Sequence, residues 1–141
     1  MATPIILDAV KPNRQFNIKA AVFIDDALGN PIPLIANQVA SISYTVYQLL
    51  DILPPEITTG RVVTGSGSFV PANVISNTMI TGATWDKATT PNYAAGYNWN
   101  LPIPGSFIPL LATTYEIQVT TTLNSGLQFD DWYTVSTLNV P

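Results

Sequence analysis

Two stretches of alternating apolar and polar residues between positions 114 and 138 predict a β-hairpin. In the first stretch the apolar parity is Tyr115, Ile117, Val119 and Leu123, and the polar parity is Glu116, Gln118, Thr120 and Thr122. In the second stretch Phe129, Asp131, Tyr133, Val135 and Thr137 share one parity, and Trp132, Thr134, Ser136 and Leu138 take the other. A period of two is typical of a half-buried strand. The Asn124-Ser125-Gly126 connection ends in the residue best able to adopt a left-handed conformation, so we expect this hairpin to close a β-sandwich.

Similar alternation predicts further strands earlier in the chain. These strands cover residues 16–24, 32–35, 39–50 and 97–103. The second of them contains Pro33, which restricts it to an edge or bulge position. Residues 25–31 are rich in Asp, Asn, Gly and Pro and predict a turn. Residues 56–72 indicate a weak strand, or a hairpin that turns at Gly65-Ser66-Gly67.

The pattern describes an all-β chain. No segment sustains the apolar spacing of an amphipathic helix over several turns. About seven short strands separated by Gly and Pro turns are typical of an antiparallel β-sandwich, and 141 residues are enough for one domain. We expect residues 16–141 to form that single domain and residues 1–15 to form an N-terminal arm or edge strand. Residues 49–90 fit the strand pattern poorly, so we expect a long irregular insertion there.

Composition excludes several kinds of function. Charged residues make up 10% of the chain, against about 25% in an average soluble protein, and the net charge is -4. Five Lys and Arg residues are too few for the clustered cations that bind nucleic acid. No apolar run approaches the length of a membrane helix, and the sequence at the start lacks the pattern of a signal peptide. We therefore expect no nucleic-acid partner, no membrane span and no secretion.

No catalytic constellation emerges from the sequence. The chain has no Cys and no His, so it lacks thiolate chemistry, disulfides, the commonest general base and the commonest transition-metal ligand. Asp25-Asp26 and Asp130-Asp131 are the acidic pairs, but neither lies in the spaced pattern of a calcium loop. Neighbours on a strand point to opposite faces, so neither pair predicts a carboxylate dyad. We expect no enzyme activity, metal or cofactor.

The aromatic residues leave two interpretations open. Tyr93, Tyr97, Trp99, Trp132 and Tyr133 occur at strand spacing, which favours packing in the core or against another subunit. Amphipathic rings also form platforms on which sugars stack. The alternative function is therefore a carbohydrate-binding β-sandwich module with Trp85, Trp99 or Trp132 as the stacking residue.

The order of these features resembles the small immunoglobulin-like β-sandwich domains of tailed-bacteriophage virion proteins, which include capsid-decoration, neck and baseplate components. The residues that carry the resemblance are the strand from Phe16 to Ile24, the D-x-x-G-x-P-x-x-L pattern from Asp26 to Leu34, Tyr44-Thr45-Val46-Tyr47, Tyr115-Glu116-Ile117-Gln118-Val119, Asn124-Ser125-Gly126 and Asp131-Trp132-Tyr133-Thr134-Val135. The resemblance implies an immunoglobulin-like fold. It also implies a non-enzymatic virion component that is made in the host cytoplasm and assembles in symmetric copies with other virion proteins.

Exposed apolar residues mark interaction sites, and two segments supply candidates. The candidate partner-binding residues are Leu49, Leu50, Ile52, Leu53, Phe107, Ile108, Leu110 and Leu111. The first four interrupt the strand alternation before Pro54-Pro55, which predicts a loop with exposed leucines or a strand end packed on a neighbour. The N-terminal arm, residues 1–10, is a further candidate because an extended segment can add a strand to a neighbouring sheet edge.

Overall fold

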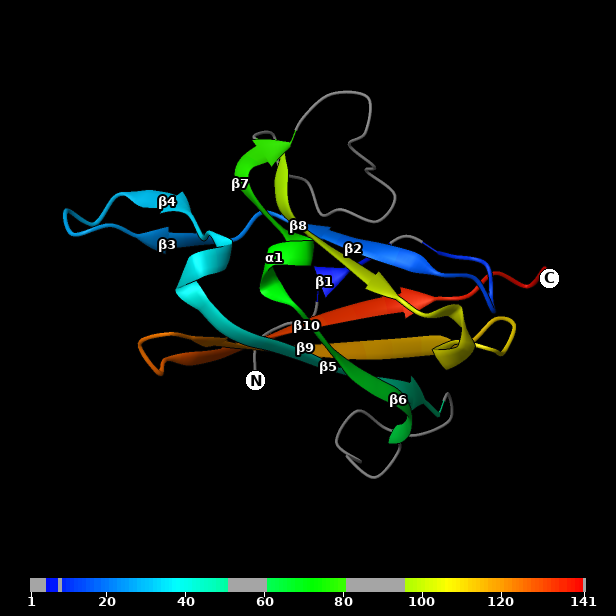
Figure 1. Ribbon diagram of the computed structural model, residues 1–141. Helices are drawn as coiled ribbons and strands as arrows, with labels where there is room; N and C mark the ends of the chain where they lie inside the picture. Colours follow the sequence, from blue (N-terminus) through cyan, green and yellow to red (C-terminus); the bar gives the residue numbers. More distant parts are fainter. Residues whose placement is uncertain (1–4, 8, 51–60, 81–95, 141) are drawn as a thin grey trace.

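Two β-sheets pack face to face in the computed structural model, which describes residues 5–7, 9–50, 61–80 and 96–140 (Figure 1). The larger sheet has the strand order β1 (Ile5–Ile6), β10 (Gln128–Ser136), β9 (Thr114–Leu123), β5 (Val39–Leu49) and β6 (Arg61–Phe69). The smaller sheet has the order β2 (Phe16–Ala20), β8 (Tyr97–Ile103) and β7 (Ile75–Ile80). β3 (Phe23–Asp25) and β4 (Pro31–Pro33) form a separate hairpin. The expected all-β sandwich is confirmed.

Short helical turns connect some of the strands. They are η1 (Ala36–Gln38), α1 (Pro71–Val74) and η2 (Gly105–Phe107). In the part of the chain that the structure describes, no helix is long and apolar enough to cross a membrane.

The core lies between the two sheets and follows the predicted parity. The larger sheet contributes Ile42, Val46, Tyr115, Ile117, Val119, Tyr133 and Val135, and the smaller sheet contributes Ile18, Trp99, Leu101 and Ile103. Full burial of one such aliphatic side chain is worth roughly 1.5–3 kcal/mol. The alternating pattern therefore predicted the residues that hold the sandwich together.

The predicted closing hairpin is present as β9 and β10. Its register pairs Ile117 with Tyr133 and Tyr115 with Val135, so the inward-facing residues of both strands meet on one face. Gly126 has a φ of 91° and its N–H donates to the carbonyl of Leu123 at 2.9 Å. The left-handed conformation expected at this glycine is confirmed.

The predicted strand over residues 16–24 is interrupted in the structure. β2 ends at Ala20, and the buried side chain of Asn98 then binds the backbone of Val22 in both directions, at 2.7 Å to its N–H and 2.9 Å to its carbonyl. The same amide donates to the carbonyl of Leu34 at 3.1 Å. The Asn98 side chain thus supplies the hydrogen bonds that a neighbouring strand would otherwise make to Val22, at the point where the chain leaves the sheet for the β3–β4 hairpin.

The turn over residues 25–31 follows the predicted chemistry. One carboxylate oxygen of Asp26 accepts from the N–H groups of Leu28 and Asn30, each at 2.9 Å. Gly29 supplies a φ of 81°. The turn joins the two strands of the β3–β4 hairpin.

The alternative of a hairpin that turns at Gly65-Ser66-Gly67 is wrong, because β6 runs through both glycines. A Cβ atom at Gly65 would overlap the ring of Phe107, and one at Gly67 would overlap the ring of Tyr44. The rings of Tyr44 and Phe69 stack with their centroids 4.8 Å apart. The glycines are therefore needed for the close approach of aromatic rings to the strand.

The long irregular insertion expected over residues 49–90 is replaced, where the structure describes it, by β6, α1 and β7. The described residues form ten strands in all, of which β1, β3 and β4 have only two or three residues. The other seven described strands have five or more residues each, in agreement with the expected number of about seven.

The N-terminal segment forms an edge of the protein's own larger sheet. β1 pairs in parallel with β10, and the N–H groups of Leu7 and Val10 donate to the carbonyls of Thr134 and Ser136 at 2.8 and 2.9 Å. Leu7 is buried in the core. Of the two expectations for residues 1–15, an edge strand describes residues 5–7, 9 and 10 better than a free arm.

We expect the substitution Gly65→Ala to lower the free energy of unfolding by about 1–3 kcal/mol, because the new methyl group displaces the Phe107 ring. Denaturant unfolding measures the change. Ser66→Ala, at the exposed next position, serves as the control and changes stability by less than about 0.5 kcal/mol. Phe107→Leu in the Gly65→Ala background restores part of the loss. Equal stability of Gly65→Ala and the unmodified protein would contradict this packing.

Candidate interaction surfaces

One cluster of side chains lies on the outer face of the larger sheet. Tyr47 on β5 pairs with Glu116 on β9, and Gln118 on β9 pairs with Trp132 on β10. These positions have the opposite parity to the core residues of the same strands. Arg61 begins β6 and completes the group, which we call the Arg61 cluster: Tyr47, Arg61, Glu116, Gln118 and Trp132.

Arg61 lies against two aromatic rings. Its Cζ atom is 5.0 Å from the centroid of the Trp132 ring and 5.9 Å from the centroid of the Tyr47 ring. The two rings stack on one another with centroids 6.0 Å apart and an angle of 25° between their planes. A guanidinium this close to an aromatic ring is attracted by the ring quadrupole, by roughly 0.5–1 kcal/mol at an exposed site. The aromatic pair and the cation hold one another in place.

Glu116 is the counter-ion of Arg61. The Nη2 atom of Arg61 lies 3.0 Å from Oε1 of Glu116, but the angles are not those of a hydrogen bond. Only 7% of the Glu116 side chain is exposed, against 28% of the Arg61 side chain. A carboxylate withdrawn from water in this way needs its cation nearby, so Arg61 has a structural role beside any role in binding.

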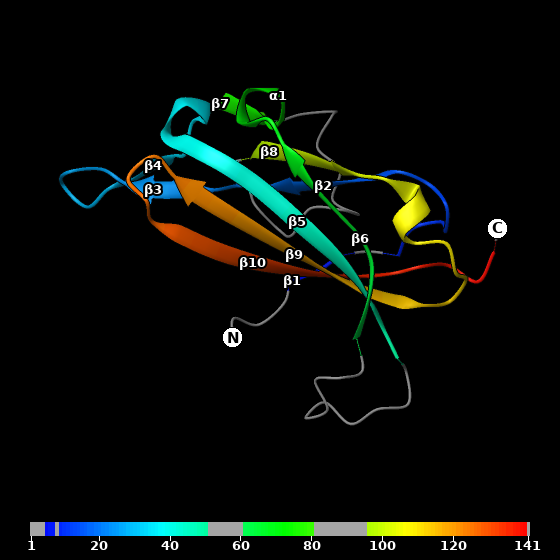
Figure 2. The same cartoon turned by 60° about the horizontal axis from the view of Figure 1, so that its bottom comes forward.

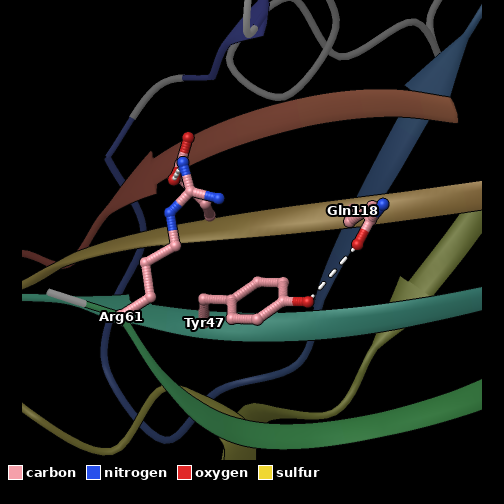
Figure 3. A network of polar contacts seen from close by, with 4 residues as sticks. Tyr47, Arg61 and Gln118 are labelled. Carbon is pink, nitrogen blue, oxygen red and sulfur yellow. Dashed lines mark hydrogen bonds and ion pairs between the residues drawn. The ribbon is translucent and has the colours of Figure 1, made fainter. Parts of the chain in front are cut away.

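Gln118 extends the cluster along the sheet. Its Oε1 accepts from the hydroxyl of Tyr47 at 3.3 Å, and its Nε2 donates to Asp130 at 3.3 Å. Figure 3 shows the Tyr47 hydroxyl pointing toward Gln118, while the Arg61 side chain extends across the sheet. The other carboxylate oxygen of Asp130 accepts from Thr120 at 2.7 Å. The polar groups of this face are thus oriented by one another.

A face of this composition is suited to binding a protein. Trp, Tyr and Arg are the residues most enriched among those that dominate interface energies. Because the ring stack, the ion pair and the hydrogen bonds already restrict the side chains, little conformational entropy remains to be lost on binding.

Exposed apolar side chains collect at the sheet end next to Arg61. They are Leu50, Val62, Val63, Leu110, Leu111 and Leu138. The register pairs Leu49 with Arg61 and Gln48 with Tyr115. The N–H of Leu110 donates to the Tyr115 hydroxyl at 3.1 Å, and that of Ala112 donates to the Leu138 carbonyl at 3.2 Å. These contacts bring the ends of β5 and β6, the segment before β9 and the C-terminal segment together, and we call this group the apolar end.

The predicted partner-binding residues differ in how far the structure exposes them. Leu50, Leu110 and Leu111 are exposed and belong to the apolar end, where the structure brings the two predicted segments together. Leu49 and Phe107 are half-buried, and Ile108 is fully buried at 0% exposure. Ile108 contributes to the core, so its side chain is not available on the surface. Ile52 and Leu53 lie outside the described residues.

Tyr47, Arg61 and Glu116 were not among the candidate binding residues predicted from the sequence. A signal was nevertheless present, because Tyr47 and Trp132 occupy the polar parity of strongly alternating strands. A large aromatic residue at an outward strand position is worth examining as a binding residue.

The other aromatic candidates belong to the core. Tyr97, Trp99 and Tyr133 are at most 5% exposed, which confirms the packing interpretation for them. Trp85 and Tyr93 lie outside the described residues. Trp132 is therefore the one described member of the predicted sugar platform that reaches the surface.

Asp130 and Asp131 point to opposite faces of β10, as their adjacency predicts. Asp130 is exposed on the outer face, whereas Asp131 is partly buried and lines a hollow on the other side. Burial raises the pKa of Asp131 above its ordinary value of 3.8, and the negative charge of Asp130 adds to the rise. Among the described residues, no group of three or more acidic side chains is arranged to hold a metal ion.

We expect Arg61→Ala to lower the free energy of unfolding by about 1–3 kcal/mol, because it leaves the Glu116 carboxylate covered and without a counter-ion. Denaturant unfolding measures this loss. Arg14→Ala removes an exposed cation elsewhere and changes stability by less than about 0.5 kcal/mol. In the Arg61→Ala background, Glu116→Gln restores stability because it removes the unpaired charge. Additive effects of the two substitutions would show that the pair is not coupled.

The pKa of Asp131 predicts a pH dependence of stability. Because its folded-state pKa is raised, the folded protein binds more protons than the unfolded chain between the two pKa values, and stability falls as the pH rises through that window. Thermal unfolding from about pH 4 to about pH 7 measures this fall. The fall is smaller in Asp131→Asn, which is also more stable than the unmodified protein at neutral pH. An unchanged pH profile in Asp131→Asn would refute the assignment.

Comparison with protein-family models, with curated proteins and with solved structures finds no match.

Proposed function

We propose that this protein is a non-enzymatic structural component of a tailed-bacteriophage virion that binds neighbouring protein subunits. A capsid-decoration protein or a neck or tail adaptor would have this role. The observation that carries the proposal is the continuity of the Arg61 cluster with the apolar end, through Arg61 and the exposed Val62 and Val63. Aromatic residues and Arg at the centre of a contact, with apolar residues beside them, have the composition of a protein interface.

The arrangement of strands supports the immunoglobulin-like part of the proposal. In an immunoglobulin sandwich the strands B, E and D form one sheet and C, F and G form the other. Here β2, β8 and β7 form one sheet, and β5, β9 and β10 are neighbours in the other, with β6 outside β5. The chain order of these strands also agrees with that assignment.

The composition supports assembly from the cytoplasm of the host. A chain without Cys folds in a reducing compartment without losing any disulfide. Its low charge leaves apolar and hydroxyl-bearing side chains on the surface. Such a surface is suited to permanent contact with other subunits, and we propose a symmetric oligomer or lattice as the assembled form.

A carbohydrate-binding module is the second candidate function. The observation in its favour is the Tyr47–Trp132 stack beside the polar side chains of Gln118 and Asp130. Arg61 and Tyr47 both contact the Trp132 ring, however, which leaves less of that ring for a sugar to stack on. The protein-contact proposal is therefore the better supported of the two.

We expect light scattering to report an oligomer, or a complex with a co-expressed virion protein. Trp132→Ala should weaken that association roughly 30-fold, as loss of a central aromatic anchor does. Leu28→Ala removes the exposed tip of the β3–β4 hairpin and serves as the control with unchanged association. Circular dichroism checks that both variants are folded.

Two results would contradict the proposal. The first is a strict monomer that ignores virion proteins but binds a glycan, with the binding lost in Trp132→Ala. This outcome would favour the carbohydrate-binding module. The second is unchanged association in Trp132→Ala and in Leu110→Ser/Leu111→Ser, which would exclude both candidate surfaces.

A further inference from the structure

A small hollow lies between the segment that joins β2 to β3 and the first half of β10. Its volume is about 280 Å³, and its lining consists of Ala20, Ala21, Val22, Phe23, Phe129, Asp131 and Tyr133. The β3–β4 and β9–β10 hairpins project from the same end of the sandwich (Figures 1 and 2). The lining of the hollow comes from the residues that lead into β3 and from the first half of β10. It is separate from the Arg61 cluster, which occupies the outer face of the sheet.

Among the described residues that line the hollow, Asp131 is the one charged residue. It has the inward parity of Phe129 and Tyr133, so its carboxylate lies on the side of β10 that faces the other sheet. Asp131 makes no hydrogen bond or ion pair with any residue that the structure describes. The segment on the opposite wall, residues 20–23, supplies no charged group, and the adjacent Asp130 is negative and faces outward.

An uncompensated carboxylate in a half-enclosed site favours a cationic ligand. Burial raises the pKa of Asp131, which means that the ionised form lacks the solvation or the counter-charge it would have in water. A bound cation would supply that counter-charge. A divalent metal does not fit, because calcium requires six to eight oxygen ligands and the described residues of the lining offer a single carboxylate.

The remaining lining indicates an organic cation. Three aromatic residues, Phe23, Phe129 and Tyr133, line the same hollow as Asp131. Ammonium and guanidinium groups are attracted to aromatic faces. The volume lies just below the range of about 300–1,000 Å³ that is typical of small-molecule sites. One small cationic group fits this description better than a large ligand.

We propose that this hollow binds one alkylammonium or guanidinium group, with Asp131 as the counter-ion and Phe23 and Phe129 as aromatic walls. The group has two possible sources, a free amine or the side chain of Lys or Arg from another protein. The second source rests on the proposed function, since it makes the hollow a socket for a neighbouring subunit. The first source does not depend on it.

The test is an NMR titration of the labelled protein with n-butylammonium and guanidinium chlorides at pH 7, with sodium chloride at equal ionic strength as the salt control. Saturable shifts are expected at the amides of residues 20–23 and 129–133. Asp131→Asn should weaken binding at least about tenfold, a loss of about 1.4 kcal/mol. Asp130→Asn removes the same charge from the neighbouring, outward-facing position and should leave the affinity within about threefold.

Several results of the titration would contradict binding of a cation in the hollow. Shifts that do not saturate, shifts equal to those with sodium chloride, or equal affinity of Asp131→Asn and the unmodified protein would overturn the proposal. Phe23→Ala provides a second, independent variant, and unchanged affinity of this variant would overturn the role of Phe23 as an aromatic wall.

The source of the cation is tested with Nα-acetyl-lysine methylamide. Binding at least as tight as that of n-butylammonium indicates a protein side chain, and exclusion of the larger compound indicates a free amine. Failure of this proposal is distinguishable from failure of the proposed function. Absence of amine binding would overturn the first, whereas unchanged association in Trp132→Ala would count against the second.

Discussion

The structure depends on the alternation of side chains along β9, which lies between β10 and β5. Ile117 and Val119 point into the core, whereas Glu116 and Gln118 belong to the outer face. A shift of one residue in the pairing register would exchange these faces and place the charged and amide groups between the sheets. A single strand thus supports both the stability of the sandwich and the order of its candidate contact surface.

The same constraint explains how a chain with few charges keeps an ordered surface. Asp130 and Gln118 use the outward positions of neighbouring strands to bind one another, and Arg61 covers Glu116. Polar groups of this face are therefore satisfied largely within the sheet. The exposed apolar residues are concentrated where the strands end, so the two kinds of surface meet at the start of β6.

The sequence was sufficient for features that depend on local chemistry, and insufficient for those that depend on distant contacts. Alternation predicted β5, β8, β9 and β10, and turn residues predicted the conformation of Gly29 and Gly126. Gly65 suggested a turn when only its neighbours in the sequence were considered. A glycine is needed there because the ring of Phe107, which is distant in the sequence, packs against the strand. Ile108 was grouped with exposed leucines because a continuous apolar run has no period that separates buried from exposed members. The Arg61 cluster required the pairing of four strands, which no single segment reveals.

The side chain of Asn98 has a consequence for the freedom of the β3–β4 hairpin. It binds Val22 just before β3 and Leu34 just after β4, and the N–H of Leu34 also donates to the carbonyl of Val22 at 2.9 Å. Both legs of the hairpin are therefore clamped at its root, while Leu28 at its tip is 86% exposed. Because the hairpin is fixed at its root, changes at the tip are not transmitted to the two sheets. Residues 27–30 are therefore a place where the chain can be lengthened or can carry an inserted peptide.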